Sequence, residues 1–448
     1  MSFSHFGRAR GFTKKKVHQM IQKWFRLQEH GTNVTQEIMA GIVSFFTVVY
    51  IIVVNASILA DAGIPFEMGV AATVFTSFIG CLMVGFWANT PNVLVPGMGV
   101  NALFSYTIVQ GMGLPWQEAL AAVFISGLVV TVISFTSLTD LIAKAIPNSL
   151  KHAITVGIGF LLTFIGMEKG GLIVSGKSTL LALGSFSDPH VLLTLASLGI
   201  TLFLFVRNVR GNLLIGIALG TALAALFGGL NTGSGGETAL SLADYGSFIG
   251  AMSFDSIGSV VFWVAAFSLI LVVLFENVGL IHGQMEMIKR PDKFKRTFQA
   301  SAVSAVTAGV LGTSPTISSV ETAAGISAGG RTGLTSITTG ILFLSSIAAI
   351  PLIKLIPSSA IAPVLMIIGG LMIQSIREIK FDDMTDWFPA FLTIAAIPLT
   401  SSIVDGMAFG FIAYPLLKIA TGKWKSVGIV SYVIAMLFVM NFVLHTAG

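Results

Sequence analysis

Apolar runs of about 20 residues recur along the whole chain, and they constrain its fold more than any other feature. A helix of that length crosses the ~30 Å hydrocarbon core of a bilayer. Hydrophobic residues make up 54% of the 448 residues and charged residues only 10%, whereas a soluble domain carries about 25% charged residues. The sequence therefore predicts an all-α polytopic membrane protein, in preference to a large soluble protein with buried helices.

The runs divide into 14 predicted membrane spans and one further apolar segment. The spans are expected at 36–60, 66–87, 91–110, 115–138, 152–168, 190–206, 211–230, 258–285, 294–312, 313–330, 331–356, 359–376, 387–403 and 404–420, and the last apolar segment at 426–445.

The basic residues predict how the chain is oriented in the membrane. With the N-terminus in the cytoplasm, all of the 25 Lys and Arg except Lys169, Lys177 and Lys354 fall on the inner side, as the positive-inside rule requires. We therefore expect a multi-pass protein of the cell membrane (plasma or inner). The net charge of +5 reflects this orientation and does not point to nucleic acid as a partner.

Residues 1–35 are expected to form a cytoplasmic tail. Within this tail Val17, Met20, Ile21 and Trp24 recur at helical spacing with Lys between them. This pattern predicts an amphipathic helix on the inner leaflet, and a disordered tail is the alternative.

Two groups of seven spans lie on either side of a polar, glycine-rich connector near 231–255. An odd number of spans per half gives the halves opposite orientations, which is typical of the inverted repeats of secondary transporters. Weak matches occur in the same order in both halves: "VVYIIVVNASIL" with "ILVVLFENVGLI", "VLVPGMGVNALF" with "SPTISSVETAAG", and "GNLLIGIALGTALAAL" with "DGMAFGFIAYPLLKIA". The first match places Asn55 on Asn277, and the second places Asn101 on Glu321.

The third and tenth segments begin with sequence that cannot be helical throughout. "NTPNVLVPGMG" and "GTSPTISS" both contain Pro, which lacks a backbone donor and disrupts a helix interior, and both contain residues that favour extended backbone. We expect each to form a short strand that leads into a half-helix, and the two strands to pair as an antiparallel ribbon. Broken segments at matching repeat positions predict a binding site near the middle of the membrane.

Two acidic residues lie deep in predicted spans. Glu276 follows the apolar run 260–275, and Glu321 begins the tenth half-helix. A charge at this depth costs roughly 2.5 kcal/mol or more, so an intramembrane carboxylate is by default a functional candidate. A helix N-terminus also favours negative charge at Glu321. The alternatives are a snorkelling or purely structural role for either residue.

Two asparagines accompany the carboxylates. Asn101 is the repeat counterpart of Glu321 and is expected either to bond a ligand or to cap its own half-helix. Asn277 faces about 100° away from Glu276 on a helix, and it either joins the site or ties its span to the first through Asn55.

The sequence contains no signature of a metal, cofactor or catalytic site. Cys81 is the single cysteine and the histidines do not cluster. Because no Walker loop, nucleophile elbow or HExxH motif is present, we expect no cofactor and no enzymatic activity. The acidic pair is expected to bind a solute rather than to act as a hydrolytic dyad.

Four stretches resemble the azaguanine-resistance-type purine permeases, a branch of the nucleobase–ascorbate transporter family. They are "LQEHGTNVTQEIMAGIVSFFTVVYIIVVN", "PGMGVNALFSYTIVQGMGLPWQEAL", "ETAAGISAGGRTGLTS" and "SSIVDGMAFGFIAYPLLKIATGKW". The resemblance runs from about residue 25 to the C-terminus.

The resemblance implies seven plus seven spans in two domains and import of nucleobases by proton symport, with one domain moving against the other. The implied division is a core domain of 36–138 and 258–356, a gate domain of 139–257 and 357–420, and a C-terminal hydrophobic segment at 421–448. A homodimer through the gate domain is expected by analogy.

The resemblance also implies which residues meet the substrate. The candidates for substrate binding are Glu276, Glu321, Asn101, Phe104, Ser319, Val320 and Asn277. Glu321 or Glu276 would carry the coupled proton.

One departure leaves the identity of the purine open. The branch usually shows "FDxxGT" where this chain has "FENVGLIHG", so Glu276 replaces Asp and Leu280 replaces Thr. A carboxylate that accepts two parallel N–H bonds suits guanine, and it also suits hypoxanthine or xanthine in part, whereas adenine suits Asn or a protonated carboxyl.

Three other functional classes remain for comparison. An anion transporter of the SulP kind has a similar fold but would need a basic residue between the half-helices. A permease for uracil or another nucleobase is the nearest alternative. A passive channel would need neither the carboxylates nor the broken segments.

Overall fold

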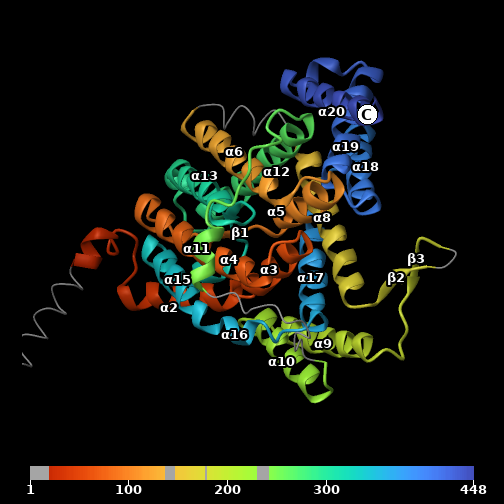
Figure 1. Ribbon diagram of the computed structural model, residues 1–448. Coiled ribbons are helices and arrows are strands. Elements are labelled where there is room, and N and C mark those ends of the chain that lie inside the picture. The colour runs from red at the N-terminus through yellow and green to blue at the C-terminus, as the bar shows by residue number, and fades with distance from the viewer. Residues whose placement is uncertain (1–19, 137–146, 177–178, 230–241, 448) are drawn as a thin grey trace, which may run out of the picture.

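The computed structural model of the chain describes residues 20–136, 147–176, 179–229 and 242–447 (Figure 1). Val17 of the predicted amphipathic helix and Lys177 of the predicted outer loop lie outside these ranges. Met20 and Trp24 belong to a short helical stretch and are 58% and 68% exposed.

The first half of the chain folds into helices interrupted by the strand β1 and by the antiparallel strand pair β2–β3. Its elements are α2 (Val34–Val48), α3 (Ile51–Asp61), α4 (Phe66–Met83), η1 (Val84–Ala88), β1 (Leu94–Pro96), α5 (Met98–Ala102), η2 (Leu103–Gly111), α6 (Trp116–Phe135), α8 (Asn148–Lys169), β2 (Ile173–Ser175), β3 (Leu181–Leu183), α9 (Pro189–Val206), α10 (Asn212–Leu226) and α11 (Leu242–Phe248). η1 and η2 are π-helices.

The second half follows the same plan. Its elements are α12 (Val260–Met287), η3 (Pro291–Lys293), α13 (Phe294–Leu311), β4 (Thr316–Ser318), α14 (Thr322–Ser327), α15 (Gly333–Ser345), η4 (Ser346–Ala349), α16 (Ile350–Ile353), α17 (Ser358–Ile373), η5 (Gln374–Glu378), α18 (Met384–Thr400), α19 (Ile403–Ala420), η6 (Trp424–Ser426) and α20 (Ile429–Ala447).

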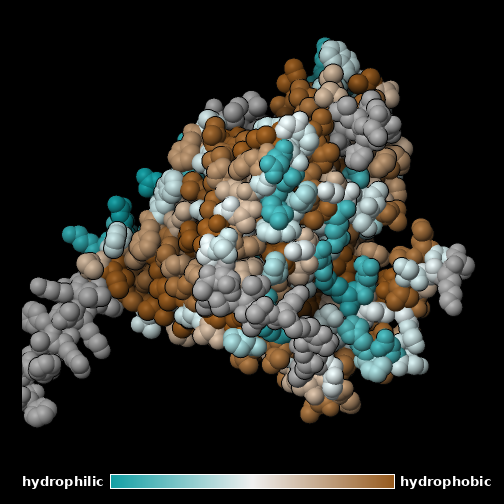
Figure 2. All heavy atoms as spheres, in the orientation of Figure 1, coloured by the Kyte–Doolittle hydropathy of each residue, from teal (hydrophilic) through white to brown (hydrophobic). Residues whose placement is uncertain are grey.

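Within the described ranges, 9 helices are long and apolar enough to cross a membrane. They confirm a mostly helical polytopic membrane protein. The segments at 91–110 and 313–330 are broken by β1 and β4, as expected, and the segment at 211–230 contains the shorter helix α10. The count of 14 spans therefore stays a prediction. Figure 2 shows hydrophobic side chains over much of one face, as a lipid-facing surface requires.

The helices pack in two groups (Figure 1). We call α2 to α6 and α12 to α16 the ribbon group, because they surround the β1–β4 ribbon. We call α8 to α10 and α17 to α19 the flanking group. α8 packs on α17 and α18, while α13 packs on α4 and α6. The assignment of these groups as core and gate domains stays a prediction.

Small residues allow close helix packing in the ribbon group. A Cβ atom at Gly127 of α6 would lie 2.7 Å from the backbone nitrogen of Val306, and one at Gly309 of α13 would lie 2.8 Å from that of Phe124. Both separations are too short for any side chain, so the two glycines let α6 and α13 approach backbone to backbone, as is common between membrane helices.

Equivalent hydrogen bonds occur in the two halves. Asn55 of α3 donates to Thr73 of α4 at 2.7 Å, and Asn277 of α12 accepts from Ser301 of α13 at 2.9 Å. The proposed repeat alignment matched these two asparagines. Each links the first span of a half to the second span, because α2 and α3 together form the first span, and this is what an inverted repeat predicts.

The segment before α2 is tied to the loop between α12 and α13. The ring nitrogens of His30 lie 3.2 Å from Arg290 Nη1 and 3.2 Å from Lys293 Nζ. Burial, aided by the two cations, lowers the pKa of His30 to about 4, and burial and Arg290 lower the pKa of Lys293 to about 8. His30 is therefore neutral at pH 7 and can accept a hydrogen bond from one of the two cations.

Two loops test the predicted orientation. In a Cys81→Ser background, we expect Ser187→Cys to react with a membrane-impermeant maleimide added to intact cells. Asp292→Cys should react only after permeabilisation, because the loop around it carries the basic residues that stay inside. Both positions are exposed in the structure. Labelling of Asp292→Cys from outside would reverse the assignment.

Candidate functional site

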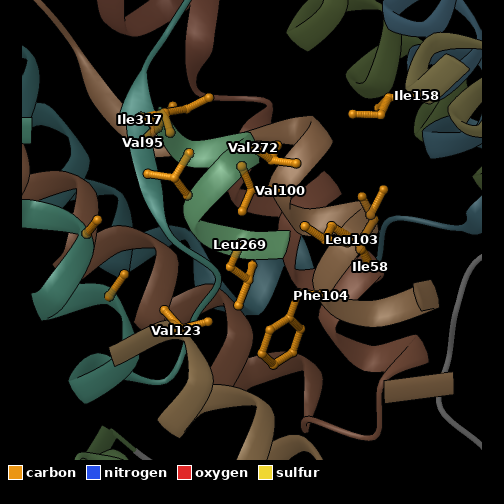
Figure 3. Packing of buried hydrophobic residues seen from close by; sticks show 14 of the residues in the cluster. Ile58, Val95, Val100, Leu103, Phe104, Val123, Ile158, Leu269, Val272 and Ile317 are labelled. Carbon is orange, nitrogen blue, oxygen red and sulfur yellow. The ribbon is translucent and has the colours of Figure 1, made fainter. Parts of the chain in front are cut away.

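The two broken segments pair with each other at the centre of the ribbon group. β1 and β4 are antiparallel, with Leu94 opposite Ser318 and Pro96 opposite Thr316. Figure 3 shows Val95 and Ile317, the middle pair, side by side in the apolar core. The antiparallel ribbon expected from the sequence is confirmed. It provides partners for backbone groups that would otherwise be unpaired at membrane depth.

Further bonds extend the ribbon beyond the strands. Ser319 N donates to Val93 O at 2.9 Å, Val93 N donates to Thr322 Oγ1 at 3.0 Å, and Gly97 N donates to Pro315 O at 3.3 Å. Each strand then leads directly into a short helix. Asn101 lies within α5, and Glu321 occupies the N-cap position of α14 without a capping bond from its side chain.

α12 is fastened to the ribbon by two buried amides on one side of the helix. Asn277 Oδ1 accepts from Ser318 N at 2.9 Å. Gln284 Oε1 accepts from Asn92 Nδ2 at 2.6 Å and from Ser318 Oγ at 2.7 Å, while its Nε2 donates to Ser319 O at 2.7 Å. These bonds hold the middle of α12, and with it Glu276, against the ribbon.

The structure does not pair Asn277 with Asn55, which was one of the two interpretations of its role. Asn55 Nδ2 donates instead to Thr73 and to Thr313, at 2.7 and 3.0 Å. Asn277 is fully buried and uses its oxygen on the ribbon and on α13. Its part in substrate binding stays a prediction.

Glu276 projects from α12 toward the turn between β1 and α5. A Cβ atom at Gly99 would lie 2.5 Å from Glu276 Oε1, and one at Gly97 would lie 3.4 Å from Oε2. The glycines of "PGMG" therefore make room for the carboxylate. Oε2 is buried and has no hydrogen-bond partner among the described residues, so Glu276 has a free acceptor at the site.

Glu321 has a different environment. The hydroxyl of Tyr50 donates to its Oε1, and the hydroxyl of Ser319 donates to its Oε2. The Glu321 backbone N–H also donates to Ser319 Oγ at 3.2 Å. Both carboxylate oxygens are thus already engaged by hydroxyl groups.

The other candidates differ in exposure. Asn101 is buried, accepts from the hydroxyl of Ser314, and has an Nδ2 without a partner in the described part of the chain. Phe104 is fully buried among apolar residues (Figure 3). Ser319 is 6% exposed, whereas Val320 is 65% exposed. Each substrate-binding role stays a prediction.

Sequence reasoning missed Tyr50 and Gln284. Tyr50 lies between α2 and α3 inside the apolar run "VVYIIVVN", where a hydroxyl was the only signal. Gln284 follows Asn277 by two helical turns, so the shared face of α12 could have been recognised from the spacing. Within the ranges that the structure describes, no three His, Cys, Asp or Glu residues form a group that could hold a metal ion.

Comparison with known proteins assigns the family. The sequence profile named Xan_ur_permease, described as a permease family, matches residues 35–409. The chain belongs to this permease family. This profile and the relatives described next confirm the purine-permease resemblance drawn from the sequence motifs, and the permease is a multi-pass membrane transporter, not an enzyme.

Several relatives cover most of the permease. The nucleobase transporter PlAzg2 of Paenibacillus larvae is 54% identical over 385 residues, which is 85% of this chain and 77% of PlAzg2. The guanine/hypoxanthine permease PbuO of Bacillus subtilis is 40% identical and covers 92% of this chain and 98% of PbuO. The adenine permease AdeP of Escherichia coli is 33% identical and covers 96% of this chain and 98% of AdeP.

Solved structures share the fold of the permease. The transmembrane domain of the cyanobacterial bicarbonate transporter BicA superposes with a TM-score of 0.64 at 16% identity, over 84% of this chain and 97% of that domain. Murine Slc26a9, an anion transporter in the inward-facing state, gives a TM-score of 0.62 at 13% identity, over 86% of this chain and 68% of that chain.

Gln284 should be important for stability. Gln284→Leu leaves Asn92, Ser318 and Ser319 O with fewer partners, and each buried polar group left unsatisfied costs about 1–3 kcal/mol. We expect a clearly lower melting temperature for the purified permease. A thiol-reactive fluorophore can measure it, because Cys81 is fully buried and becomes reactive only on unfolding.

The control variant is Met287→Leu, an exposed position on the same helix. Its melting temperature should equal that of the unsubstituted permease. Equal melting temperatures for Gln284→Leu and Met287→Leu would show that the amide bonds do not hold α12 to the ribbon.

Proposed function

We propose that the permease imports purine nucleobases by proton symport. The observation that carries this proposal is the pair of unlike carboxylates at the ribbon. Glu276 has a buried oxygen with no partner among the described residues, while both oxygens of Glu321 accept hydroxyl hydrogen bonds. The names of the relatives, which include nucleobase, guanine/hypoxanthine and adenine transporters, support the substrate class.

The chemistry of a purine fits this site. A purine is a flat apolar ring system with donors and acceptors on its edge, so its site needs apolar walls and a few fixed polar groups. Glu276 would accept the parallel N–H groups of a 6-oxopurine, since its Oε2 has no other partner in the described part of the chain. Guanine offers two such donors, and hypoxanthine offers one.

We assign the coupled proton to Glu321. A neutral base brings no charge to offset a buried carboxylate, so one carboxylate must be neutralised during transport. The hydroxyls of Tyr50 and Ser319 can donate to an ionised Glu321 or accept from a protonated one. They therefore provide partners for both protonation states. Release of the proton on the inner side would couple uptake to the gradient.

The motion that we propose follows the two helix groups. The core domain, 36–138 and 258–356, carries the ribbon and both carboxylates, and it would move against the gate domain, 139–257 and 357–420. The N-terminus would be cytoplasmic. By analogy with the family, we also propose that two copies of the chain form a homodimer through their gate domains.

An anion substrate is the second candidate, because BicA and Slc26a9 share the fold. The polar contacts at the ribbon argue against it. Glu276 and Glu321 both lie there, and no Lys or Arg of the described residues bonds to either of them. An anion would meet two carboxylates with no countercharge, which is electrostatically unfavourable.

The experiment that tests this function is uptake of labelled guanine, hypoxanthine, adenine, xanthine and uracil. Cells lacking their own permeases should accumulate at least one purine when they express this chain, and a protonophore should abolish the accumulation. Uptake of bicarbonate in place of every nucleobase would favour the anion transporter instead.

Glu276→Gln should weaken purine binding strongly while the amount of folded protein changes little. The substitution replaces an acceptor by a donor opposite the N–H groups of the base, and an unpaired buried partner costs about 1–3 kcal/mol, or more with a charge. We expect the Kd for guanine of the purified protein to rise tenfold or more. An unchanged Kd would exclude Glu276 as the partner of the base.

Glu321→Gln should separate binding from coupling. The amide keeps the shape of the side chain and one acceptor but cannot exchange a proton, so purine binding should persist while proton-driven accumulation is lost. Glu321→Ala should lose both. Purified protein and vesicles would be measured in parallel. Protonophore-sensitive accumulation by Glu321→Gln would show that Glu321 does not carry the coupled proton and would assign that role to Glu276.

A further inference from the structure

An ion pair joins the two helix groups at the far ends of α3 and α8. Lys169 Nζ lies 2.7 Å from Asp61 Oδ2 and 2.8 Å from Oδ1. The side chains are only 18% and 27% exposed. Tyr106 OH donates to Asp61 Oδ2 at 2.6 Å, and Lys169 also approaches Ser57 Oγ at 3.3 Å. A partly buried, hydrogen-bonded pair is worth more than an exposed one.

This pair occupies a special place in the fold. Of the ion pairs in the described part of the chain, it is the one that links the ribbon group to the flanking group. Lys354 with Glu67 stays inside the ribbon group, at 2.9 Å. A motion that separates the outer ends of α3 and α8 would therefore break the Asp61–Lys169 pair.

A cavity of about 480 Å³ surrounds the ion pair. We call it the seam cavity. Besides the ion pair, its lining includes the rings of Tyr106 and Phe164, and the polar side chains of Gln110 and Glu168. These residues come from the ends of predicted odd-numbered spans, which the charge distribution places on the outer side.

The ion pair lies at the outer end of the seam cavity, away from the ribbon site. Ile158 of α8 borders the ribbon site, since a Cβ atom at Gly99 would lie 3.2 Å from its Cδ1. At ~1.5 Å per helical residue, the stretch of α8 from Ile158 to Lys169 spans roughly 16 Å. The cavity extends inward along α8 to Leu161, but a base docked at the ion pair would lie well outward of Glu276.

The ion pair and the edge of a 6-oxopurine have complementary patterns. Guanine presents a carbonyl acceptor, a ring N–H and an amine in a row. Lys169 offers donors beside the two acceptor oxygens of Asp61, and a carboxylate that accepts two parallel N–H bonds is the strong arrangement. Aromatic walls and a few polar groups are what a flat heterocycle requires.

We propose that the seam cavity is an outer docking site for a 6-oxopurine, whose edge replaces the Asp61–Lys169 ion pair. Lys169 then donates to the 6-oxo group and Asp61 accepts from the N–H groups of the base. Docking therefore breaks the direct ion pair between the two helix groups and lets them separate. This inference rests on the proposed function, because it names where the same substrate first binds.

Lys169→Met tests the docking site. The variant removes the donor to the 6-oxo group, so the KM for guanine uptake from outside should rise about tenfold. The Kd of purified protein at the ribbon site should stay within twofold, because Glu276 is untouched. The inhibition constant of adenine, which has an amine in place of the oxo group, should change less than twofold.

Lys354→Met is the matched control. It also removes a lysine from a partly buried ion pair on the predicted outer side, and it should leave the guanine KM unchanged. If Lys169→Met does not reach the membrane, Lys169→Gln keeps one donor and should raise the KM by a smaller factor.

The outcomes separate the two proposals. If the unchanged permease takes up no purine, the proposed function fails. If it takes up guanine but Lys169→Met leaves the guanine KM unchanged, or raises it together with the Kd and the adenine constant, the docking site fails alone.

Discussion

A backbone polar group without a partner costs several kcal/mol in hydrocarbon, and the architecture of the site depends on meeting this constraint. The permease carries two segments that cannot be helical throughout, one in each half of the chain. They pair with each other as β1 and β4. This pairing sets where α5 and α14 begin, and hence the positions of Asn101 and Glu321. It also requires α12 to lie against the ribbon, which brings Glu276 to the same place.

Two carboxylates in one protein interior perform different tasks only if their surroundings differ. Glu276 lies against Gly97 and Gly99 and keeps one oxygen without a partner among the residues that the structure describes, whereas Tyr50 and Ser319 occupy both oxygens of Glu321. A free acceptor suits a ligand that donates. An acceptor held by hydroxyls, which can reverse their hydrogen bonds, suits a proton that comes and goes.

The repeat makes the backbone similar in both halves, while side chains make the site asymmetric. Asn55 and Asn277 link equivalent helices, but the proposed repeat alignment places the neutral Asn101 of the first half on the acidic Glu321 of the second. Both acidic side chains of the site therefore come from the second half of the chain. The link to the flanking group comes from the first half, through Asp61 at the end of α3.

The sequence by itself determined the membrane class, the broken third and tenth segments, their pairing and the two intramembrane acids, because apolar run length, proline and charge act locally. It did not reveal Tyr50, Gln284 or the link from Asp61 to Lys169. Those partners lie far apart in the chain, and their contacts exist only after the helices pack. Tertiary structure alone decided which acid is satisfied, because hydrogen-bond satisfaction depends on neighbours that no local pattern specifies.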